Sequence, residues 1–383
     1  MTELSSTLES LQVVGKRKGG KKRFLVYGAT GYTGQLICKH AIQCGLDITL
    51  SGRNNHKLER LAKELTLPPS SYVCVGLQET AKLDTALEGI DVVVHCAGPF
   101  LETFSPMVEA CLRNGVHYID INGEIGVIEG IYQKYDKEAK DKGVMLLPAA
   151  GFDVVPSDTL IHLLDEHFGE TFPHARADQI DLSFHFNKAG ALISRGTGNV
   201  MKGGKRGVCV VRQRGEIVEK EAKPIPLKER KRCYYGFVNK EMTVKPANMA
   251  DVASAFYSTG IGNVRCFMSD VASMLQLRCV MTPFSEKSSD RSSSKQQPIG
   301  PSAEENMEGK AYLHCSISSK SGDEKVSGSL ECPAPYKVTY LAVIYVLKEI
   351  ERKSVAKVGF CTPSLAYGKQ FLKACDMAWQ IDK

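Results

Sequence analysis

Three glycines at intervals of three residues could bind the phosphates of a dinucleotide. Gly28, Gly31 and Gly34 directly follow the apolar run Phe24–Tyr27. The first glycine allows a tight turn, the second lets the backbone approach a phosphate without an intervening Cβ, and the third allows close packing of helix on strand. The helix that follows offers N–H groups and a partial positive charge to an anion. This pattern predicts a dinucleotide-binding loop; the alternative is a structural turn in an unrelated α/β fold.

The end of the second apolar run bears on the choice between NAD and NADP. An NAD-selective site places Asp or Glu there to bind the ribose 2′-hydroxyl. This chain has Ser51-Gly52-Arg53-Asn54 instead. The Arg53 guanidinium can stack on adenine and bind a 2′-phosphate, and Ser51 and Asn54 can add hydrogen bonds. We therefore predict NADP(H) as cofactor, with a preference for NADPH over NADH. A surface position for Arg53 is the alternative.

Further residues of the cofactor crevice are expected after the later strands. Ligands of an open parallel sheet bind beyond the carboxyl ends of its strands. Small residues there let the chain pass close to the nicotinamide ribose. The full predicted cofactor-binding set is Gly28, Thr30, Gly31, Tyr32, Thr33, Gly34, Ser51, Arg53, Asn54, Cys96, Ala97, Gly98, Pro99, Gly123, Gly151 and Phe152.

Hydride transfer also needs a proton donor near the nicotinamide, and four side chains are candidates. Asp153 and Glu124 follow apolar runs, so both are expected at the catalytic edge; Tyr257 and His95 complete the set. Each has a structural alternative. Asp153 could cap the next helix, Glu124 could be held by backbone N–H groups near Gly126, Tyr257 could be packing, and His95 could be a buried core histidine.

Two common catalytic arrangements are absent from the sequence. None of the 14 tyrosines has a lysine four residues later, which argues against short-chain reductase chemistry. There is no His-Glu-x-x-His, and the nine histidines lack paired metal spacing, so no metal site is predicted. For substrate binding we single out Arg195 and Thr197, because the arginine could anchor an anionic group. A surface role for Arg195 is the alternative.

The elements that must position these residues alternate from Arg23 onward. Apolar, strand-like runs are Phe24–Tyr27, Ile48–Leu50, Tyr72–Val75, Val92–Cys96, Tyr118–Ile121 and Met145–Pro148. Helical patterns between them are Gln35–Gln43, Lys57–Leu65, Leu83–Leu87, Pro106–Asn114 and Gly126–Lys142. This alternation predicts βαβ units and an α/β Rossmann domain with a doubly wound parallel sheet over residues 22–153.

A second, α+β domain with an antiparallel sheet is predicted for residues 154–335. Its strand-like segments are longer and amphipathic, and Ala311–Ser319 and Lys325–Glu331 read as a hairpin. The Ser-rich stretch 285–299 predicts a disordered loop at about 285–304. Residues 336–383 are expected to form helices, the last reaching Trp379, that return to the Rossmann domain.

Composition points to a globular chain. Hydrophobic residues make up 43% and charged residues 24%, enough for a sizeable core. The formal net charge is +6, with basic residues gathered in 16–23; a solvated, flexible basic tail over 1–21 is favoured over a nucleic-acid or membrane patch. The 13 cysteines include no Cys-x-x-Cys pair, and Cys38, Cys74, Cys96 and Cys111 sit in apolar segments. Reduced, mostly buried thiols in a cytoplasmic protein are expected, without a signal peptide or membrane segment.

Four blocks of sequence together resemble the saccharopine dehydrogenase-like oxidoreductases, and the trans-acting enoyl reductase branch in particular. They are Gly28–Gly34, Cys96–Phe100, Tyr118–Glu124 and Ala150–Asp158. The Gly-Phe-Asp-x-x-Pro-Ser-Asp pattern in the last block is the distinctive one. Gly76 departs from the family, because relatives often carry an acidic residue after the third strand.

The resemblance implies a second, α+β domain with a mixed sheet that is often used for dimerisation, and a C-terminal segment returning to the Rossmann side. It also implies NADP(H)-dependent hydride transfer. The favoured function is an NADPH-dependent enoyl reductase acting on a conjugated C=C bond of an enoyl thioester, a polyene or a polyketide-type intermediate. A polyketide or fatty-acid synthase is then an expected partner, and a homodimer the expected assembly. The alternatives are an imine (C=N) reductase, an opine or saccharopine-type dehydrogenase, and a non-catalytic NADP-binding scaffold.

Overall fold

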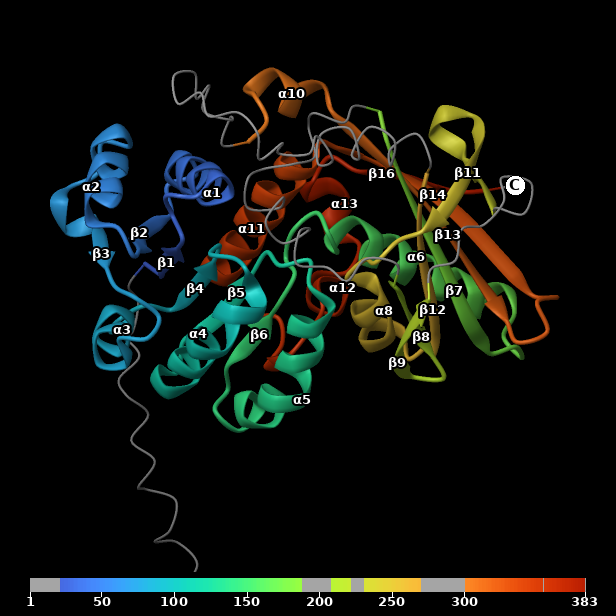
Figure 1. Ribbon diagram of the computed structural model, residues 1–383, viewed down its shortest axis with the longest axis horizontal. Helices are drawn as coiled ribbons and strands as arrows, with labels where there is room; N and C mark the ends of the chain where they lie inside the picture. Colours follow the sequence, from blue (N-terminus) through green and yellow to red (C-terminus); the bar gives the residue numbers. More distant parts are fainter. Residues whose placement is uncertain (1–20, 188–207, 222–230, 270–299, 354, 383) are drawn as a thin grey trace, which may run out of the picture.

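The computed structural model describes residues 21–187, 208–221, 231–269, 300–353 and 355–382, and arranges them around two sheets (Figure 1). The predicted tail lies outside the described residues except for Lys21, and so does the Ser-rich stretch 285–299. Residues 300–304, which the prediction included in the disordered loop, instead lie beside Tyr32 and lead into helix α10 (Ala303–Glu308).

The first sheet is parallel throughout and has seven strands in the order β15-β6-β5-β4-β1-β2-β3. Six of them follow the predicted runs, in the strand order of a Rossmann fold. Their interiors are apolar because both faces are covered, as is usual for parallel sheets. The strands are β1 (Arg23–Tyr27), β2 (Asp47–Gly52), β3 (Tyr72–Cys74), β4 (Val92–His95), β5 (His117–Asp120), β6 (Met145–Leu147) and β15 (Gly359–Phe360).

Helices cover both faces of this sheet, so the predicted doubly wound architecture is confirmed (Figure 1). One face packs against α1 (Tyr32–Gln43) and α2 (Asn55–Glu64). The other packs against α3 (Thr80–Leu87), α4 (Phe100–Asn114) and α5 (Ile125–Asp141). A short 3-10 turn, η1 (Pro69–Ser71), precedes β3.

The second sheet is mixed, as the family resemblance implies, and not antiparallel throughout, because β12 and β7 pair in parallel while its other pairs are antiparallel. Its main path is β10-β11-β12-β7-β13-β14-β16, with β8 on β12 and β9 on β8. The strands are β7 (Ala177–Phe186), β8 (Val208–Gln213), β9 (Glu216–Glu221), β10 (Arg232–Tyr235), β11 (Lys240–Pro246), β12 (Asn263–Ser269), β13 (Lys310–Ser319), β14 (Lys325–Pro333) and β16 (Ala378–Ile381). The turn η4 (Gly236–Val238) joins β10 to β11.

Helix α6 (Val155–Thr171) joins the two sheets. It begins directly after the predicted Gly151–Asp153 edge and packs against β13 and β14 of the second sheet and against α8 (Asp251–Thr259). Its first ten residues are nearly all buried, because neighbours surround that part of the helix. A single apolar cluster therefore runs from α1 and β1 through α6 into β7 and β13.

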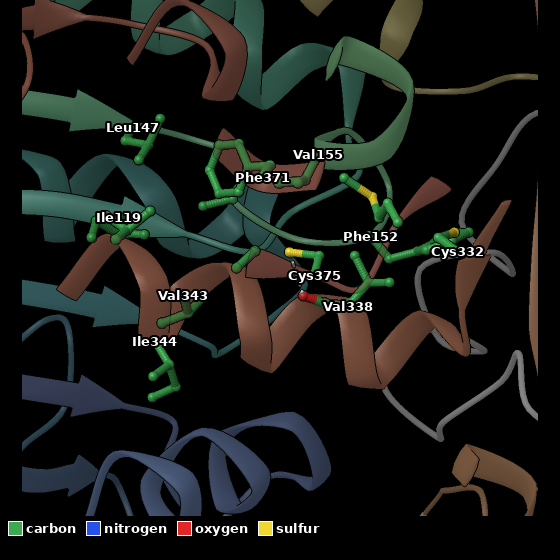
Figure 2. Packing of buried hydrophobic residues seen from close by; sticks show 14 of the residues in the cluster. Ile119, Leu147, Phe152, Val155, Cys332, Val338, Val343, Ile344, Phe371 and Cys375 are labelled. Carbon is green, nitrogen blue, oxygen red and sulfur yellow. Dashed lines mark hydrogen bonds between the residues drawn. The ribbon is translucent and has the colours of Figure 1, made fainter. Parts of the chain in front are cut away.

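The C-terminal segment contributes to both sheets. Helix α11 (Pro335–Arg352) packs against α1, and its Val338 and Val343 share a cluster with Ile119 and Leu147 of the parallel sheet (Figure 2). The short helices α12 (Pro363–Tyr367) and α13 (Gln370–Ala374) pack against α6. The prediction that the last helix reaches Trp379 is wrong. The last helix, α13, ends at Ala374, and residues Ala378–Ile381 form β16, which pairs with β14 at the sheet edge.

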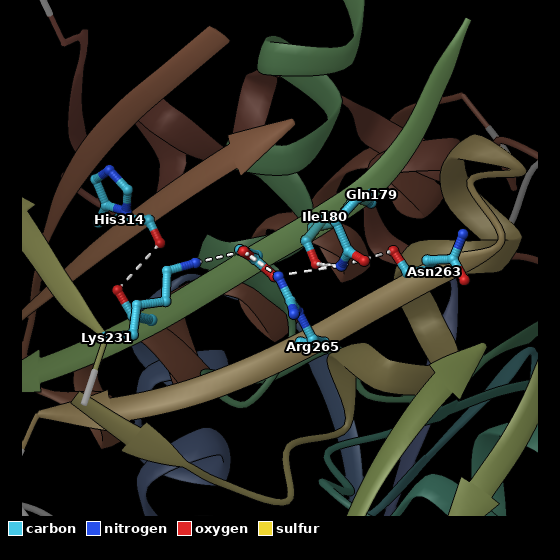
Figure 3. Close-up of polar contacts among 8 residues, drawn as sticks. Gln179, Ile180, Lys231, Asn263, Arg265 and His314 are labelled. Carbon is cyan, nitrogen blue, oxygen red and sulfur yellow. Dashed lines mark hydrogen bonds and ion pairs between the residues drawn. The ribbon is translucent and has the colours of Figure 1, made fainter. Parts of the chain in front are cut away.

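Charged side chains hold the outer face of the second sheet. The Asp181 carboxylate on β7 accepts two hydrogen bonds from Arg265, each at 2.7 Å, and one from Lys231. Figure 3 shows Lys231 and Arg265 converging from separate segments of the chain. Burial opposes ionisation of Asp181, but these cations outweigh it and lower the pKa of the carboxyl. This cluster ties β7 to β12 and to the start of β10, away from the Rossmann sheet.

Candidate functional site

The glycine-rich loop has the shape of a phosphate cradle. Gly28 has a φ of +83°, and a Cβ there would lie 2.9 Å from the backbone of residues 96 and 97. A Cβ on Gly34 would lie 2.4 Å from the carbonyl oxygen of Gly28. Only glycine fits at either position, so the loop brings β1, the β4 end and α1 together. The N-terminus of α1 follows this loop directly, and no side chain caps it, so its N–H groups are of the kind that can bind a pyrophosphate.

At the adenosine end, the predicted residues have different surroundings. Arg53 is exposed after β2, so its guanidinium is free to meet a 2′-phosphate. Asn54 instead caps α2, accepting a hydrogen bond from the Lys57 N–H at 2.9 Å. Ser51 is fully buried and donates to the Val73 carbonyl at 3.1 Å. The Asn54 and Ser51 side chains are thus engaged in hydrogen bonds within the protein, whereas the Arg53 side chain, exposed like Asn54, is available to a ligand.

Gly76, the position at which relatives often carry an acidic residue, lies next to the carboxylate of Glu79. The Glu79 carboxylate turns back and accepts a hydrogen bond from the Gly76 N–H at 2.8 Å. Hydrogen bonds from Lys82 and from this N–H lower the pKa of Glu79. The Glu79 carboxylate therefore lies beside Gly76, engaged by its N–H and by Lys82.

Glu124 is a structural carboxylate. Its two oxygens accept hydrogen bonds from the N–H groups of Phe100 (2.8 Å) and Leu101 (3.1 Å), the first residues of α4. A carboxylate at a helix N-terminus satisfies N–H groups that have no partner within the helix. Backbone N–H groups therefore hold Glu124, as the structural alternative stated, but they are those at the start of α4 and not those near Gly126. This leaves its oxygens engaged rather than free to serve as a proton donor.

Asp153 is the carboxyl group that remains available at the carboxyl edge of the sheet. Asp153 follows β6, and its carboxyl lies against Gly123. A Cβ on Gly123 would be only 2.5 Å from the Asp153 Oδ2. Its carboxyl accepts none of the hydrogen bonds found among the described residues, and its residue is only partly exposed. Burial raises its pKa to about 6. Asp153 can therefore hold a proton near neutral pH and release it, as a general acid must.

The loops that carry these groups are fixed by Asp120 at the end of β5. Its buried carboxylate accepts hydrogen bonds from Asn122 N–H (3.0 Å), Ala149 N–H (2.8 Å) and the Tyr118 hydroxyl (2.7 Å). Asn122 in turn accepts from the Glu124 N–H at 2.9 Å. The turns after β5 and β6 are thereby held against each other, which sets Gly123 beside Asp153.

Helix α11 supports the same edge from the C-terminal segment. A Cβ on Gly151 would lie 3.2 Å from the Thr339 methyl group. The Thr339 hydroxyl accepts a hydrogen bond from the Phe152 N–H at 3.0 Å. The Phe152 ring is buried and packs against Phe186 of β7, with ring centroids 5.8 Å apart. Gly151 and Phe152 therefore shape the crevice chiefly through packing.

Two buried aspartates near Asp153 were missed by the sequence prediction. Asp158, in the first turn of α6, accepts hydrogen bonds from the Ser258 hydroxyl and from the Ser364 N–H, the latter at 2.7 Å, and so ties α6 to α8 and α12. Asp251 begins α8 and is fully buried, with no hydrogen-bond partner for either oxygen among the described residues. Burial raises its pKa well above the usual range, so it stays protonated. The Gly-Phe-Asp-x-x-Pro-Ser-Asp block pointed to Asp158; no local pattern pointed to Asp251.

Tyr257 and His95 have structural surroundings. The Tyr257 hydroxyl donates to Glu129 at 2.9 Å, and Glu129 pairs with the buried Arg212. Burial, followed by Glu129, raises the pKa of Tyr257. His95 is fully buried among Tyr27 and Phe100, and burial lowers its pKa to about 3, so it is neutral. The structural alternatives stated for both residues therefore apply.

The predicted substrate-binding residues Arg195 and Thr197 lie outside the described residues. Within the described part of the chain, no cluster of His, Cys, Asp and Glu side chains has the arrangement of a metal site. Cys38 and Cys111 are buried as predicted, whereas Cys74, expected to be buried, is exposed at the end of the edge strand β3. Among the helices described, none is long and apolar enough to cross a membrane.

Residues 24–147 match the family described as the saccharopine dehydrogenase NADP binding domain, and they are an NADP-binding domain of this type. The glycine cradle fits this cofactor, because Gly28 and Gly34 permit the tight strand-to-helix turn that a dinucleotide-binding loop requires. The prediction of NADP(H) as cofactor is thus confirmed at the level of the domain, while the roles of Arg53 and of the glycine loop stay predictions.

Three curated relatives match part of the chain. A saccharopine dehydrogenase-like oxidoreductase of Bos taurus is 33% identical over 150 residues, covering 35% of each chain. A trans-acting enoyl reductase of Mycobacterium ulcerans is 31% identical over 144 residues, 37% of this chain and 34% of its own. A lipid droplet localized protein of Caenorhabditis elegans is 27% identical over 163 residues, 40% of this chain and 38% of its own. Each match spans little more than a third of the relative's length.

Two solved structures share the fold of nearly the whole chain. Saccharopine dehydrogenase (L-Glu forming) from Saccharomyces cerevisiae has a TM-score of 0.60 at 11% identity, covering 95% of this chain and 100% of its own. Homospermidine synthase from Legionella pneumophila, in complex with NAD, has a TM-score of 0.61 at 10% identity, covering 95% and 92%. At these identities the likeness shows the fold alone.

Proposed function

We propose that this chain, whose residues 24–147 are an NADP-binding domain of the saccharopine dehydrogenase type, is an NADPH-dependent oxidoreductase that reduces a conjugated carbon–carbon double bond. The observation that carries the proposal is Asp153: a carboxyl group with a pKa of about 6, beside Gly123 at the carboxyl edge of the parallel sheet, where ligands of such a domain would bind. A domain that only binds the cofactor has no need of such a group.

The chain's own residues divide the work. When bound, NADPH supplies the hydride. The glycine loop holds the pyrophosphate, and the exposed Arg53 binds the 2′-phosphate, which gives the preference for NADPH. Asp153 then donates its proton to the carbon that becomes negatively charged after hydride addition, and regains a proton from solvent. Glu124 and Asp120 hold the surrounding turns in place.

The choice of a C=C bond rests on two supports. The mycobacterial relative at 31% identity is named an enoyl reductase. An opine-type site would need cationic anchors for two or more carboxylates, and the sequence offers few: Arg195 and the pair Lys205-Arg206. We take the acceptor to be an enoyl thioester or polyene, presented by a polyketide or fatty-acid synthase, and the protein to act as a cytoplasmic homodimer.

The test follows NADPH oxidation across a panel of enoyl thioesters, polyenes and cyclic imines. We expect turnover with enoyl compounds, and loss of at least about a hundredfold in kcat for Asp153→Asn with unchanged NADPH affinity. Asp141→Asn is the matched control, because Asp141 is exposed at the end of α5. If only imines are turned over, the bond that the protein reduces is C=N and not C=C, which would overturn this part of the proposal. No turnover anywhere, or full activity of Asp153→Asn, would overturn the proposal.

A further inference from the structure

Tyr32, a residue of the glycine-rich loop, is hydrogen-bonded to two residues that lie 269 and 274 positions away in the sequence. Its hydroxyl donates a hydrogen bond to the Pro301 carbonyl at 2.6 Å. The same hydroxyl accepts one from the Asn306 side-chain amide. Both partners belong to the segment Gly300–Asn306, which leads into β13 of the second sheet. The phosphate loop of the Rossmann domain is therefore connected directly to the second domain.

The ring of Tyr32 is enclosed as well as its hydroxyl. Gly300 lies against its face, because a Cβ on Gly300 would come within 2.5 to 2.7 Å of three ring carbons. Tyr336 of α11 packs edge-on at a centroid distance of 4.9 Å. Pro301 is buried. Position 300 can thus hold only glycine while the segment keeps this path, which indicates a specific contact rather than a loose surface loop.

An unsatisfied polar atom lies at the same place. The Asn306 side-chain oxygen is buried and has no hydrogen-bond partner among the described residues. Buried amide oxygens are nearly always paired in folded proteins, so an unpaired one beside a cofactor loop points to a ligand group that can donate to it. Hydroxyl groups on the two riboses of a dinucleotide are donors of this kind.

We propose that Gly300–Asn306 forms the outer wall of the dinucleotide site, held there by Tyr32, so that NADP(H) is bound by both domains. The cofactor lies between the glycine loop and this segment, and Asn306 accepts a hydrogen bond from a ribose hydroxyl. Because a ligand that bridges two elements stabilises their contact, binding of the cofactor and ordering of residues 300–308 are coupled. This proposal concerns binding of the cofactor and not the reaction, so its test does not depend on whether the proposed activity is found.

The experiment measures binding and hydrogen exchange in the full chain. For the wild type we expect NADPH to slow amide exchange in peptides covering residues 300–310 as well as in the glycine loop. In Tyr32→Phe, which removes both hydrogen bonds but keeps the ring, NADPH should no longer protect residues 300–310. Its Kd for NADPH, from fluorescence titration, should rise about three- to tenfold, the effect of one or two hydrogen bonds. Tyr132→Phe is the matched control, because Tyr132 is exposed on α5.

Gly300→Ala gives a second test that keeps every polar group. The new methyl group must displace the segment from Tyr32, so this variant should show the same loss of protection and of affinity. Gly169→Ala is its control, since a Cβ there meets nothing within 4 Å. Circular dichroism confirms that each variant is folded. Unchanged NADPH affinity and protection in both test variants would overturn the proposal. So would tighter binding by Tyr32→Phe, because the segment would then be an obstacle to the cofactor rather than its wall.

Discussion

The Asp153 carboxyl lies directly on the α-carbon of Gly123, so that a Cβ at position 123 would come within 2.5 Å of Oδ2 and 2.8 Å of Cγ. The turns after β5 and β6 meet at this contact. The glycine after β5 and the candidate acid after β6 are thus in close contact. The position of the acid therefore depends on the absence of a side chain on its neighbour.

Gly123→Ala should displace the Asp153 carboxyl while leaving the fold intact. A shift of about 1 Å in a catalytic group can lower kcat about a hundredfold, and we expect a loss of about ten- to a hundredfold. Gly126→Ala is the control, because its Cβ would meet only the end of the flexible, exposed Leu101 side chain. Steady-state kinetics with the best substrate of the panel provides the measurement. Equal kcat in the two variants would contradict this role for Gly123.

Asp153 should make the protein less stable above its pKa. Its pKa is about 6 in the folded protein against 3.8 ordinarily, so the folded state binds the proton more tightly than the unfolded state. The free energy of unfolding therefore falls as pH rises from about 4 to about 6, by as much as about 3 kcal/mol. Asp153→Asn removes this effect, and should be more stable than the wild type at pH 7.5 but not at pH 4. Urea unfolding at both pH values measures it; a difference independent of pH would argue against the raised pKa.

The same pKa sets the pH dependence of turnover. Since the protonated carboxyl is the active form of a general acid, kcat/KM should decline as pH rises through about 6. The decline should be absent from the residual activity of Asp153→Asn. A profile that instead rises through this range would identify Asp153 as a base.

Arg53→Ala should abolish the preference for NADPH. Arg53 is exposed after β2, where it can pair with a 2′-phosphate that NADH lacks. We expect the Kd for NADPH to rise about ten- to a hundredfold and that for NADH to change little. Arg60→Ala is the control, because that arginine is exposed on α2 and pairs with Glu64. Fluorescence titration gives the Kd for each cofactor. An equal rise in the Kd for NADH would show that Arg53 does not recognise the 2′-phosphate.

Glu124→Gln should lower stability and spare the chemistry. The amide keeps one acceptor oxygen for the α4 N-terminus but loses the other and the negative charge. The free energy of unfolding should fall by about 1–2 kcal/mol. The pH profile of turnover should keep its shape. Abolished turnover at unchanged stability would return Glu124 to the list of proton donors.

Local sequence patterns were sufficient for the Rossmann half of the molecule. Strand and helix periodicity, and the glycine spacing at positions 28, 31 and 34, depend on neighbours close in sequence, so they could be recognised without a structure. The position of Arg53 at the end of β2 could be predicted for the same reason, and its role in binding a 2′-phosphate stays a prediction. In the second domain the β13–β14 hairpin was predicted, because its two strands are joined by a short turn.

Contacts between distant residues decided the rest. Trp379 was assigned to a helix because its own segment does not show that β14 offers an edge to pair with. Glu124 and Asp153 look alike in sequence, each an acid just after a strand. In the folded protein one accepts hydrogen bonds from α4 and the other faces Gly123 with its carboxyl free. Which carboxyl keeps a proton depends on burial and hydrogen-bond donors brought from elsewhere in the chain, and these exist only once the tertiary structure has formed.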